Sequence, residues 1–312
     1  AANRLLTSGA SNVAVGHNTN DAGNTSGVTA LGGNALTSNT SDWTTAIGYA
    51  CLEDNTSGAY NIGVGAFSLK QNTTGNSNIG IGYQSLEDNT TGTYNVGVGR
   101  ASLGNNTTGT NNVAVGTLVL DSNTTGAHNT ALGDQAMTDA QTGIQNVSIG
   151  HASLYELIDG NYNVAVGTNS LRNNNADKNT AVGHASLQQN TTGTDNAALG
   201  YFALLNNTTG TRNVAMGYAA LDANTTASYN AAFGYGSLGA NTTGGHNTGI
   251  GYVALTTNST GTNNVGVGSH ALNLNTTGGG NTAVGRGSLS ANTTASNNTG
   301  IGKSALGGNL TG

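Results

Sequence analysis

The sequence predicts an all-β fold, a parallel β-solenoid or β-roll of about 18 coils with a 17-residue repeat. A glycine that closes segments such as Asn61–Gly65 recurs along the whole chain, usually every seventeen residues and three times after sixteen. Apolar residues ahead of this glycine alternate with small ones at the period of a β-strand. With 50 glycines, no proline and 7% charged residues, the chain has few large side chains for a globular core. We therefore expect its order to come from regular backbone pairing.

We call the recurring residue the anchor glycine. It occurs at Gly16, Gly32, Gly48, Gly65, Gly82, Gly99, Gly116, Gly133, Gly150, Gly167, Gly183, Gly200, Gly217, Gly234, Gly251, Gly268, Gly285 and Gly302. Eighteen positions in one register define a repeat rather than a chance pattern.

The apolar columns of the repeat predict the interior of each coil. The residue before the anchor glycine is always apolar, as in Val15, Ile81 and Ile301. The residue two places earlier is Val, Ile, Thr or Ala and shares the same strand face. Leucine follows the anchor glycine by four residues in nearly every coil, with Met137 as a close substitute. We expect these three columns to line a narrow interior.

Segments of the type Asn-Thr-Thr-Gly, such as Asn72–Gly75 and Asn106–Gly109, predict a turn. Asn and Gly tolerate left-handed backbone, and Asn side chains bond to nearby amides and to equivalent Asn residues in stacked strands. The same segments contain Asn-x-Thr glycosylation sequons. Because their spacing follows the structural period, the turn is the favoured interpretation.

The column between the two apolar strand positions contains only Ala, Gly and Ser. Alternation places it on the face opposite the expected interior, where such uniformly small residues indicate close approach by another backbone. A symmetric homo-oligomer about the long axis is the resulting hypothesis, with another strand of the same coil as the alternative. The residues predicted to pack between chains are Ala14, Gly63, Gly80, Gly97, Ala114, Ala165, Ala215, Gly249, Gly266 and Gly300.

The reiterated Asn-Val-Ala-Val-Gly pattern, seen at Asn112–Gly116 and Asn163–Gly167, resembles the head repeats of trimeric autotransporter adhesins. It is also similar to repeats of phage-type tail-fibre proteins. The resemblance extends from about Asn12 to the end of the chain and implies a left-handed parallel β-roll in which three chains pack around one axis. The coil is longer than that of the adhesin heads, mainly through the Asn-Thr-Thr-Gly turn, which favours the tail-fibre variety.

The repeat predicts a lead-in or capping segment at 1–11 and one continuous solenoid domain at 12–312. The three shortened steps and irregular turns at 139–145 and 157–162 are expected to change its bend or twist. The chain begins without Met and stops within a repeat, so we expect a piece of a longer protein.

Several classes of function are not supported by the sequence. A net charge of −6 with eight Lys and Arg residues gives no basic patch for nucleic acid. No apolar run is long enough to insert into a membrane, and the single Cys51 excludes an internal disulfide framework. The six His residues lack metal-ligand spacing, and no catalytic arrangement is present. The acidic pairs Glu53–Asp54 and Glu87–Asp88 are better explained as solvated loop charges than as a weak calcium site. We expect no enzyme activity and no cofactor.

Two columns of aromatic residues are candidate contacts for a receptor or glycan, because exposed rings stack on sugars and form binding hot spots. They follow the anchor glycine or precede the motif asparagine, and stacking ladders that stiffen the protein are the favoured alternative. The candidates are Trp43, Tyr60, Tyr94, Tyr162, Tyr201, Tyr218, Tyr235 and Tyr252.

The sequence thus predicts a homotrimeric, extracellular fibre shaft from a virion tail fibre or a bacterial surface adhesin. Such a shaft holds a binding element away from the particle or cell. A glycan-binding adhesin that uses the aromatic columns is the alternative. Ice binding ranks last, because the Thr pairs occupy turns beside Gly rather than a flat strand face.

Overall fold

The computed structural model describes residues 11–20 and 25–308, and in these residues it confirms the all-β parallel solenoid. Each coil contains one three-residue strand, and the described residues form no helix. The chain divides into two units, Ala1–Asn161 and Tyr162–Gly312, whose boundary falls in the irregular turn at 157–162. The predicted lead-in at 1–11 lies, apart from Ser11, outside the described residues. That one continuous domain spans 12–312 stays a prediction.

The first unit contains β1 to β9 and the second β10 to β18. The strands are β1 (Val13–Val15), β2 (Thr29–Leu31), β3 (Thr45–Ile47), β4 (Ile62–Val64), β5 (Ile79–Ile81), β6 (Val96–Val98), β7 (Val113–Val115), β8 (Thr130–Leu132), β9 (Val147–Ile149), β10 (Val164–Val166), β11 (Thr180–Val182), β12 (Ala197–Leu199), β13 (Val214–Met216), β14 (Ala231–Phe233), β15 (Thr248–Ile250), β16 (Val265–Val267), β17 (Thr282–Val284) and β18 (Thr299–Ile301).

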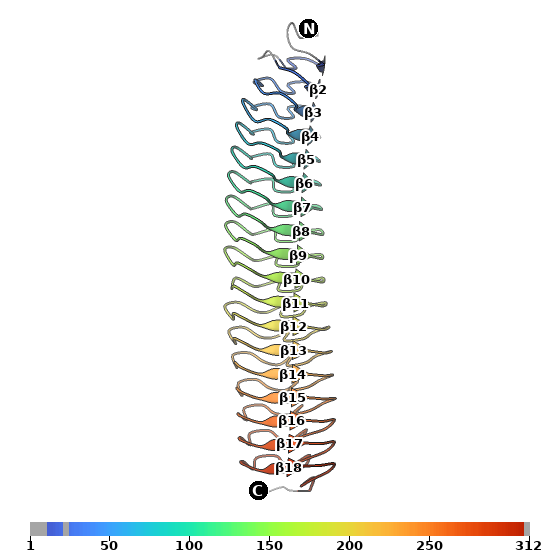
Figure 1. Ribbon diagram of the computed structural model, residues 1–312, viewed down its shortest axis with the longest axis vertical. Coiled ribbons are helices and arrows are strands. Elements are labelled where there is room, and N and C mark those ends of the chain that lie inside the picture. Colours follow the sequence, from blue (N-terminus) through green and yellow to red (C-terminus); the bar gives the residue numbers. More distant parts are fainter. Residues whose placement is uncertain (1–10, 21–24, 309–312) are drawn as a thin grey trace. The chain divides into compact units, whose positions relative to one another are not determined.

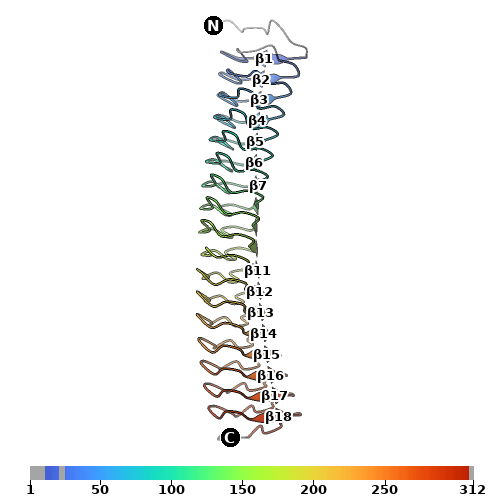
Figure 2. The same ribbon diagram turned by 60° about the vertical axis from the view of Figure 1, so that its left-hand side comes forward.

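Within each unit every strand pairs in parallel with the strand of the next coil, so that equivalent residues stand directly above one another (Figures 1 and 2). Gly63 of β4, for example, aligns with Gly80 of β5, and Gly80 aligns with Gly97 of β6. Backbone bonds continue the pairing beyond the strands, as from the Leu69 amide to the Ser85 carbonyl at 2.9 Å. Each column of the repeat therefore becomes a ladder of like residues.

We number each coil from its anchor glycine, so that the strand occupies positions −3 to −1. The structure shows that position −2 faces the interior and that positions −3 and −1 face outward, the reverse of the prediction. A Cβ atom built on Gly63 would lie 2.4 Å from Cys51 Sγ and 3.3 Å from Leu52 Cδ1. This column therefore packs against residues of its own chain.

The ten small residues predicted to pack between chains are consequently interior residues. Ala14, in the first described coil, is partly buried, and the other nine are buried. These nine are Gly63, Gly80, Gly97, Ala114, Ala165, Ala215, Gly249, Gly266 and Gly300. The column is kept small by close approach, as predicted, but the approaching groups are mainly side chains of the same chain rather than another backbone. The leucine at +4 and the residue at +3 already fill the narrow interior.

The prediction of an interior leucine column at position +4 is confirmed. From Leu36 to Leu289 these residues are fully buried, with Met137 in the same role. Their backbone is left-handed, as in Leu69 with φ 51°, a conformation that L-residues other than Asn and Asp seldom adopt. The backbone accepts this conformation because stacked coils bond to one another on both sides and the leucine side chain gains burial.

Asparagines at position +7 form a buried ladder that crosses from coil to coil. In most coils the side-chain amide donates to the Oδ1 atom of the asparagine in the preceding coil, as from Asn89 to Asn72 at 2.7 Å. It also donates to the carbonyl at position +10 of its own coil, as from Asn89 to Gly92 at 3.1 Å. These asparagines are the acceptor residues of the sequons, and in the folded coils they are buried and bonded. The turn interpretation is therefore supported.

A second asparagine ladder runs at position −4. The backbone amide of Asn78 donates to Asn61 Oδ1 at 2.9 Å, and the Asn78 side chain donates to the Gly92 carbonyl at 2.8 Å. The carbonyl at +10 thus accepts from one asparagine of each ladder. The interior is held together by amide hydrogen bonds on one side and by leucine packing on the other.

The anchor glycine is required by its conformation and by its close approach to the next coil. Gly217 has φ +135°, and a Cβ atom there would lie 2.6 Å from the Gly234 carbonyl oxygen. L-residues are excluded from this region of backbone space, and the contact is with backbone that cannot move aside.

We predict that Gly217→Ala lowers the free energy of unfolding by more than about 3 kcal/mol, because strain and overlap add. The matched control is Gly236→Ala in the following coil, where φ is +58° and a Cβ atom would meet nothing closer than 3.5 Å. Ala219 already occupies the equivalent position with φ 49°, so this change costs about 1 kcal/mol. Denaturant unfolding measures both, and equal losses would contradict the account.

Candidate functional surfaces

The outward residues at positions −3 and −1 form what we call the apolar face. At position −1, Val15 is 47% exposed, Ile81 39% and Leu132 46%. Neither position carries a charged residue in any of the described strands. In the sequence this surface cannot be told from the interior, because both faces of each strand lack charge. The residues at +3 and +4 decide which strand positions face inward, because together they leave no space inside the coil for Val or Ile.

The apolar face of the second unit contains a hollow of about 190 Å³. Ala197, the smallest residue type at position −3, lies at this site between Thr180 and Val214 of the neighbouring coils. Leu199 and Met216 also line the hollow. The surface thus has relief into which apolar side chains of a partner could pack.

Four of the candidate aromatic residues form a continuous stack in the second unit. The ring centroids of Tyr201 and Tyr218 are 5.5 Å apart with planes 2° from parallel, and those of Tyr218 and Tyr235 are 5.1 Å apart at 7°. Tyr252 continues the stack beyond Tyr235 at 5.4 Å, and His184 stacks on Tyr201 at 5.0 Å. Because the ring faces cover one another, a sugar meets only ring edges and hydroxyl groups. The geometry favours the stiffening ladder over a glycan platform.

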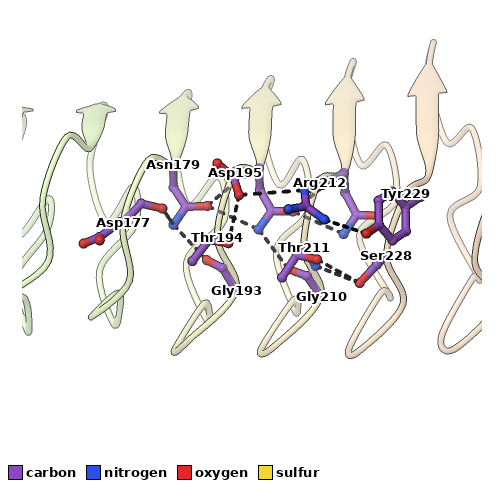
Figure 3. Close-up of polar contacts among 12 residues, drawn as sticks. Asp177, Asn179, Gly193, Thr194, Asp195, Gly210, Thr211, Arg212, Ser228 and Tyr229 are labelled. Atoms are coloured by element: carbon purple, nitrogen blue, oxygen red, sulfur yellow. Dashed lines mark hydrogen bonds and ion pairs between the residues drawn. The ribbon is translucent and has the colours of Figure 1, made fainter.

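The column before the motif asparagine, at position −5, carries a chain of polar contacts in the second unit (Figure 3). Arg212 lies between Asp195, 4.0 Å away, and Tyr229, to whose hydroxyl it donates at 2.6 Å. The Tyr229 ring in turn stacks on His246 at 4.8 Å and 8°. All of these groups are exposed, so each contact contributes little to stability. The column presents mixed charge and aromatic surface to solvent.

The remaining aromatic candidates are among the most exposed large side chains in the structure. Trp43 is 59% exposed, Tyr60 62%, Tyr94 61% and Tyr162 50%. The Trp43 ring lies against Gly27, where a Cβ atom would come within 2.4 Å of it. That these residues contact a receptor stays a prediction.

Among residues 11–20 and 25–308, no group of three or more His, Cys, Asp or Glu side chains could hold a metal ion. The acidic pairs Glu53–Asp54 and Glu87–Asp88 lie at positions +5 and +6, and Asp88 accepts a hydrogen bond from Gln71. His151 and Asp134 approach to 3.6 Å with both side chains about half exposed. In the part of the chain that the structure describes, no helix is long and apolar enough to cross a membrane.

The threonines of the Asn-Thr-Thr-Gly turns use their hydroxyl groups within the protein. The Thr73 hydroxyl donates to the Thr90 carbonyl at 3.0 Å, and Thr90 repeats the contact to Thr107 at 3.0 Å. Threonines at position +8 therefore tie one coil to the next, which leaves fewer free donors to order water, as ice binding would require.

No protein-family model matches the chain, and no curated protein matches its sequence.

Cys51 is a fully buried thiol at position +3 of the first unit. Burial raises the pKa of this thiol from 9.0 to about 12, and a backbone hydrogen bond at Ile47 lowers it in part. The thiol is therefore neutral and shielded at physiological pH, when the thiolate needed for reaction is scarce.

We predict a pH-dependent loss of stability that Cys51 causes. Because its folded pKa is above its unfolded pKa, the unfolded thiol ionises first, and the free energy of unfolding falls between pH 9 and about 12. The slope attributable to this group is about 1.4 kcal/mol per pH unit. Cys51→Ala, which places the residue type of Ala35 at the same position, removes that part of the slope in parallel denaturant titrations. Identical slopes in the two proteins would refute the assignment.

Proposed function

We propose that the chain is a shaft segment of an extracellular fibre, in which three copies pack side by side through their apolar faces. The shaft has no catalytic role. It acts as a stiff spacer that holds a binding element away from a virion or a bacterial surface. Coil-to-coil bonding on both sides of every interior coil supplies the stiffness.

The observation that carries this proposal is the apolar face of each unit. Within a unit, exposed Val, Ile and Leu side chains recur from strand to strand without a charged residue, and contiguous exposed apolar surface of this kind marks interaction sites. Covering it is favourable by roughly 25 cal/mol per Å² of apolar area. A lone chain gains none of this free energy.

A second copy of the same chain is the partner that fits best. Its apolar face has the same spacing from coil to coil, so two copies aligned in parallel can match over many coils without a change of register. Hollows such as the one at Ala197 give side chains of a partner a place to pack. The resemblance to trimeric adhesin and tail-fibre repeats supports three copies and a left-handed coil.

The proposal keeps the self-association predicted from the sequence but assigns it to different residues. The inward Ala and Gly column cannot contact a partner because it packs against its own leucines. The Val, Ile, Leu and Thr residues at −3 and −1 take that role.

We predict that the chain has three times its 30.8 kDa mass in solution and that Ile81→Lys together with Leu132→Lys makes it monomeric. In a symmetric assembly each new lysine meets its own copies, and like charges at an apolar seam repel and lose hydration. Size-exclusion chromatography with light scattering measures the mass.

The matched control is Thr91→Lys with Thr142→Lys, which places the same charges in the same two coils at exposed turn positions. This control should keep the mass of the unmodified chain. A monomeric unmodified chain at micromolar concentration, or dissociation of the control as well, would contradict the proposal.

A further inference from the structure

A groove of about 480 Å³ opens on the outer wall of the last coils of the second unit. Its lining includes His270, Arg286 and Lys303 together with the polar side chains Asn273, Ser290 and Ser304. Two of the eight Lys and Arg residues of the chain thus meet at one concave site, together with a histidine.

The positive charge of this groove has no acidic counterpart nearby. The sequence contains no Asp or Glu after Asp222, which lies four coils before Arg286. At about 4.8 Å per coil, that separation is close to 19 Å, beyond the Debye length of roughly 8 Å at physiological ionic strength. Among the described residues, no Asp or Glu side chain therefore competes with an external anion for Arg286 and Lys303.

The basic residues are arranged along the stack of coils. Arg286 and Lys303 directly follow the anchor glycines of consecutive coils, so their backbones are about one strand spacing apart, roughly 4.8 Å. His270 belongs to the coil before, and its Nδ1 atom lies 2.8 Å from the Ser269 hydroxyl, which orients the ring. With its amide oriented so that both groups are satisfied, the Asn273 side chain donates to the carbonyls of His270 and Ser290 at 3.2 and 3.1 Å and so links two adjacent coils of the wall.

The first unit provides a comparison at the same coil positions. A groove of about 240 Å³ there is lined by Arg100 with Glu87 and Asp121. Burial raises the pKa of Asp121, an effect that the positive charge of Arg100 partly offsets. Arg100 therefore has carboxylates of its own chain beside it, whereas Arg286 at the equivalent position has none.

We propose that the groove of the second unit binds an acidic polysaccharide, with sulfate or carboxylate groups of neighbouring sugars contacting Arg286 and Lys303. A single small anion would gain little, because exposed ion pairs contribute about 0 to 1 kcal/mol each. A polysaccharide with an anionic group on neighbouring sugars can contact both cations at once. Because its anionic groups are covalently linked, the second contact forms within the complex and raises the overall affinity. A polysaccharide suits this groove better than a nucleic acid does, because its hydroxyl groups can both donate to and accept from the Asn273, Ser290 and Ser304 side chains, whereas ionised phosphate groups only accept.

Calorimetric titration of the full chain at low ionic strength tests this proposal with a sulfated hexasaccharide and a hexasaccharide of uronic acids. Binding of either one is expected, and the one that binds identifies the acidic group. Arg286→Gln with Lys303→Gln should weaken binding at least about tenfold, and added salt should weaken it in the unmodified chain. Both side chains are exposed, so circular dichroism and the solution mass should not change.

Arg100→Gln is the matched control and should leave the affinity unaltered. The proposal is overturned if neither acidic hexasaccharide binds, if a neutral hexasaccharide binds equally well, or if Arg100→Gln weakens binding as much as the double change. Tighter binding of a single-stranded hexanucleotide would also overturn it. Because mass and binding are measured separately, failure here is distinguishable from failure of the trimeric shaft.

Discussion

The buried asparagine ladder at position +7 is the interaction on which the coil depends most. In most coils the side-chain amide satisfies an acceptor in the coil before it and a carbonyl of its own turn, as Asn207 does with Asn190 at 2.8 Å and Gly210 at 3.0 Å. A hydrogen bond of this kind contributes about 1 kcal/mol net, but a buried group left without its partner costs about 1 to 3 kcal/mol. The ladder therefore enforces one spacing and one register between coils. Within 39–292 the ladder is interrupted only where Ala140 and Leu157 replace asparagine, beside the boundary of the two units. In the coil before Ala140, the Oδ1 atom of Asn123 has no partner among the described residues.

The ladder also explains which residues face outward. Two asparagine columns and one leucine column occupy most of a narrow interior, and only Ala, Gly or Ser fits at the strand position that faces them. The branched apolar residues of the strand are then left on the surface. The self-association that we propose covers this surface, so the proposal and the composition of the interior rest on the same constraint.

The repeat, the strand positions, the leucine interior and the asparagine ladder could be predicted from the sequence because each appears as a column with a single physical requirement. The direction of the strand side chains could not, since small and branched apolar residues alternate there and either set is compatible with an interior. Only the space left by Leu69 and its equivalents decides between them. The aromatic columns were visible in the sequence, but the nearly parallel planes of Tyr201 and Tyr218 depend on side-chain torsions that no pattern specifies. The basic groove was missed because Arg286 and Lys303 are seventeen residues apart and become neighbours only when coils stack.

A double-mutant cycle in the ladder tests the central claim most directly. Asn72→Ala and Asn89→Ala remove adjacent members, so the second change deletes the Asn89 amide donor that the first leaves without its acceptor. Denaturant unfolding should give a combined loss smaller than the sum of the single losses by about 1 to 3 kcal/mol. Asn72→Ala combined with Asn241→Ala, whose sites are ten coils apart, should be additive within about 0.5 kcal/mol. Additive losses for the adjacent pair would contradict the ladder as the interaction that joins the coils.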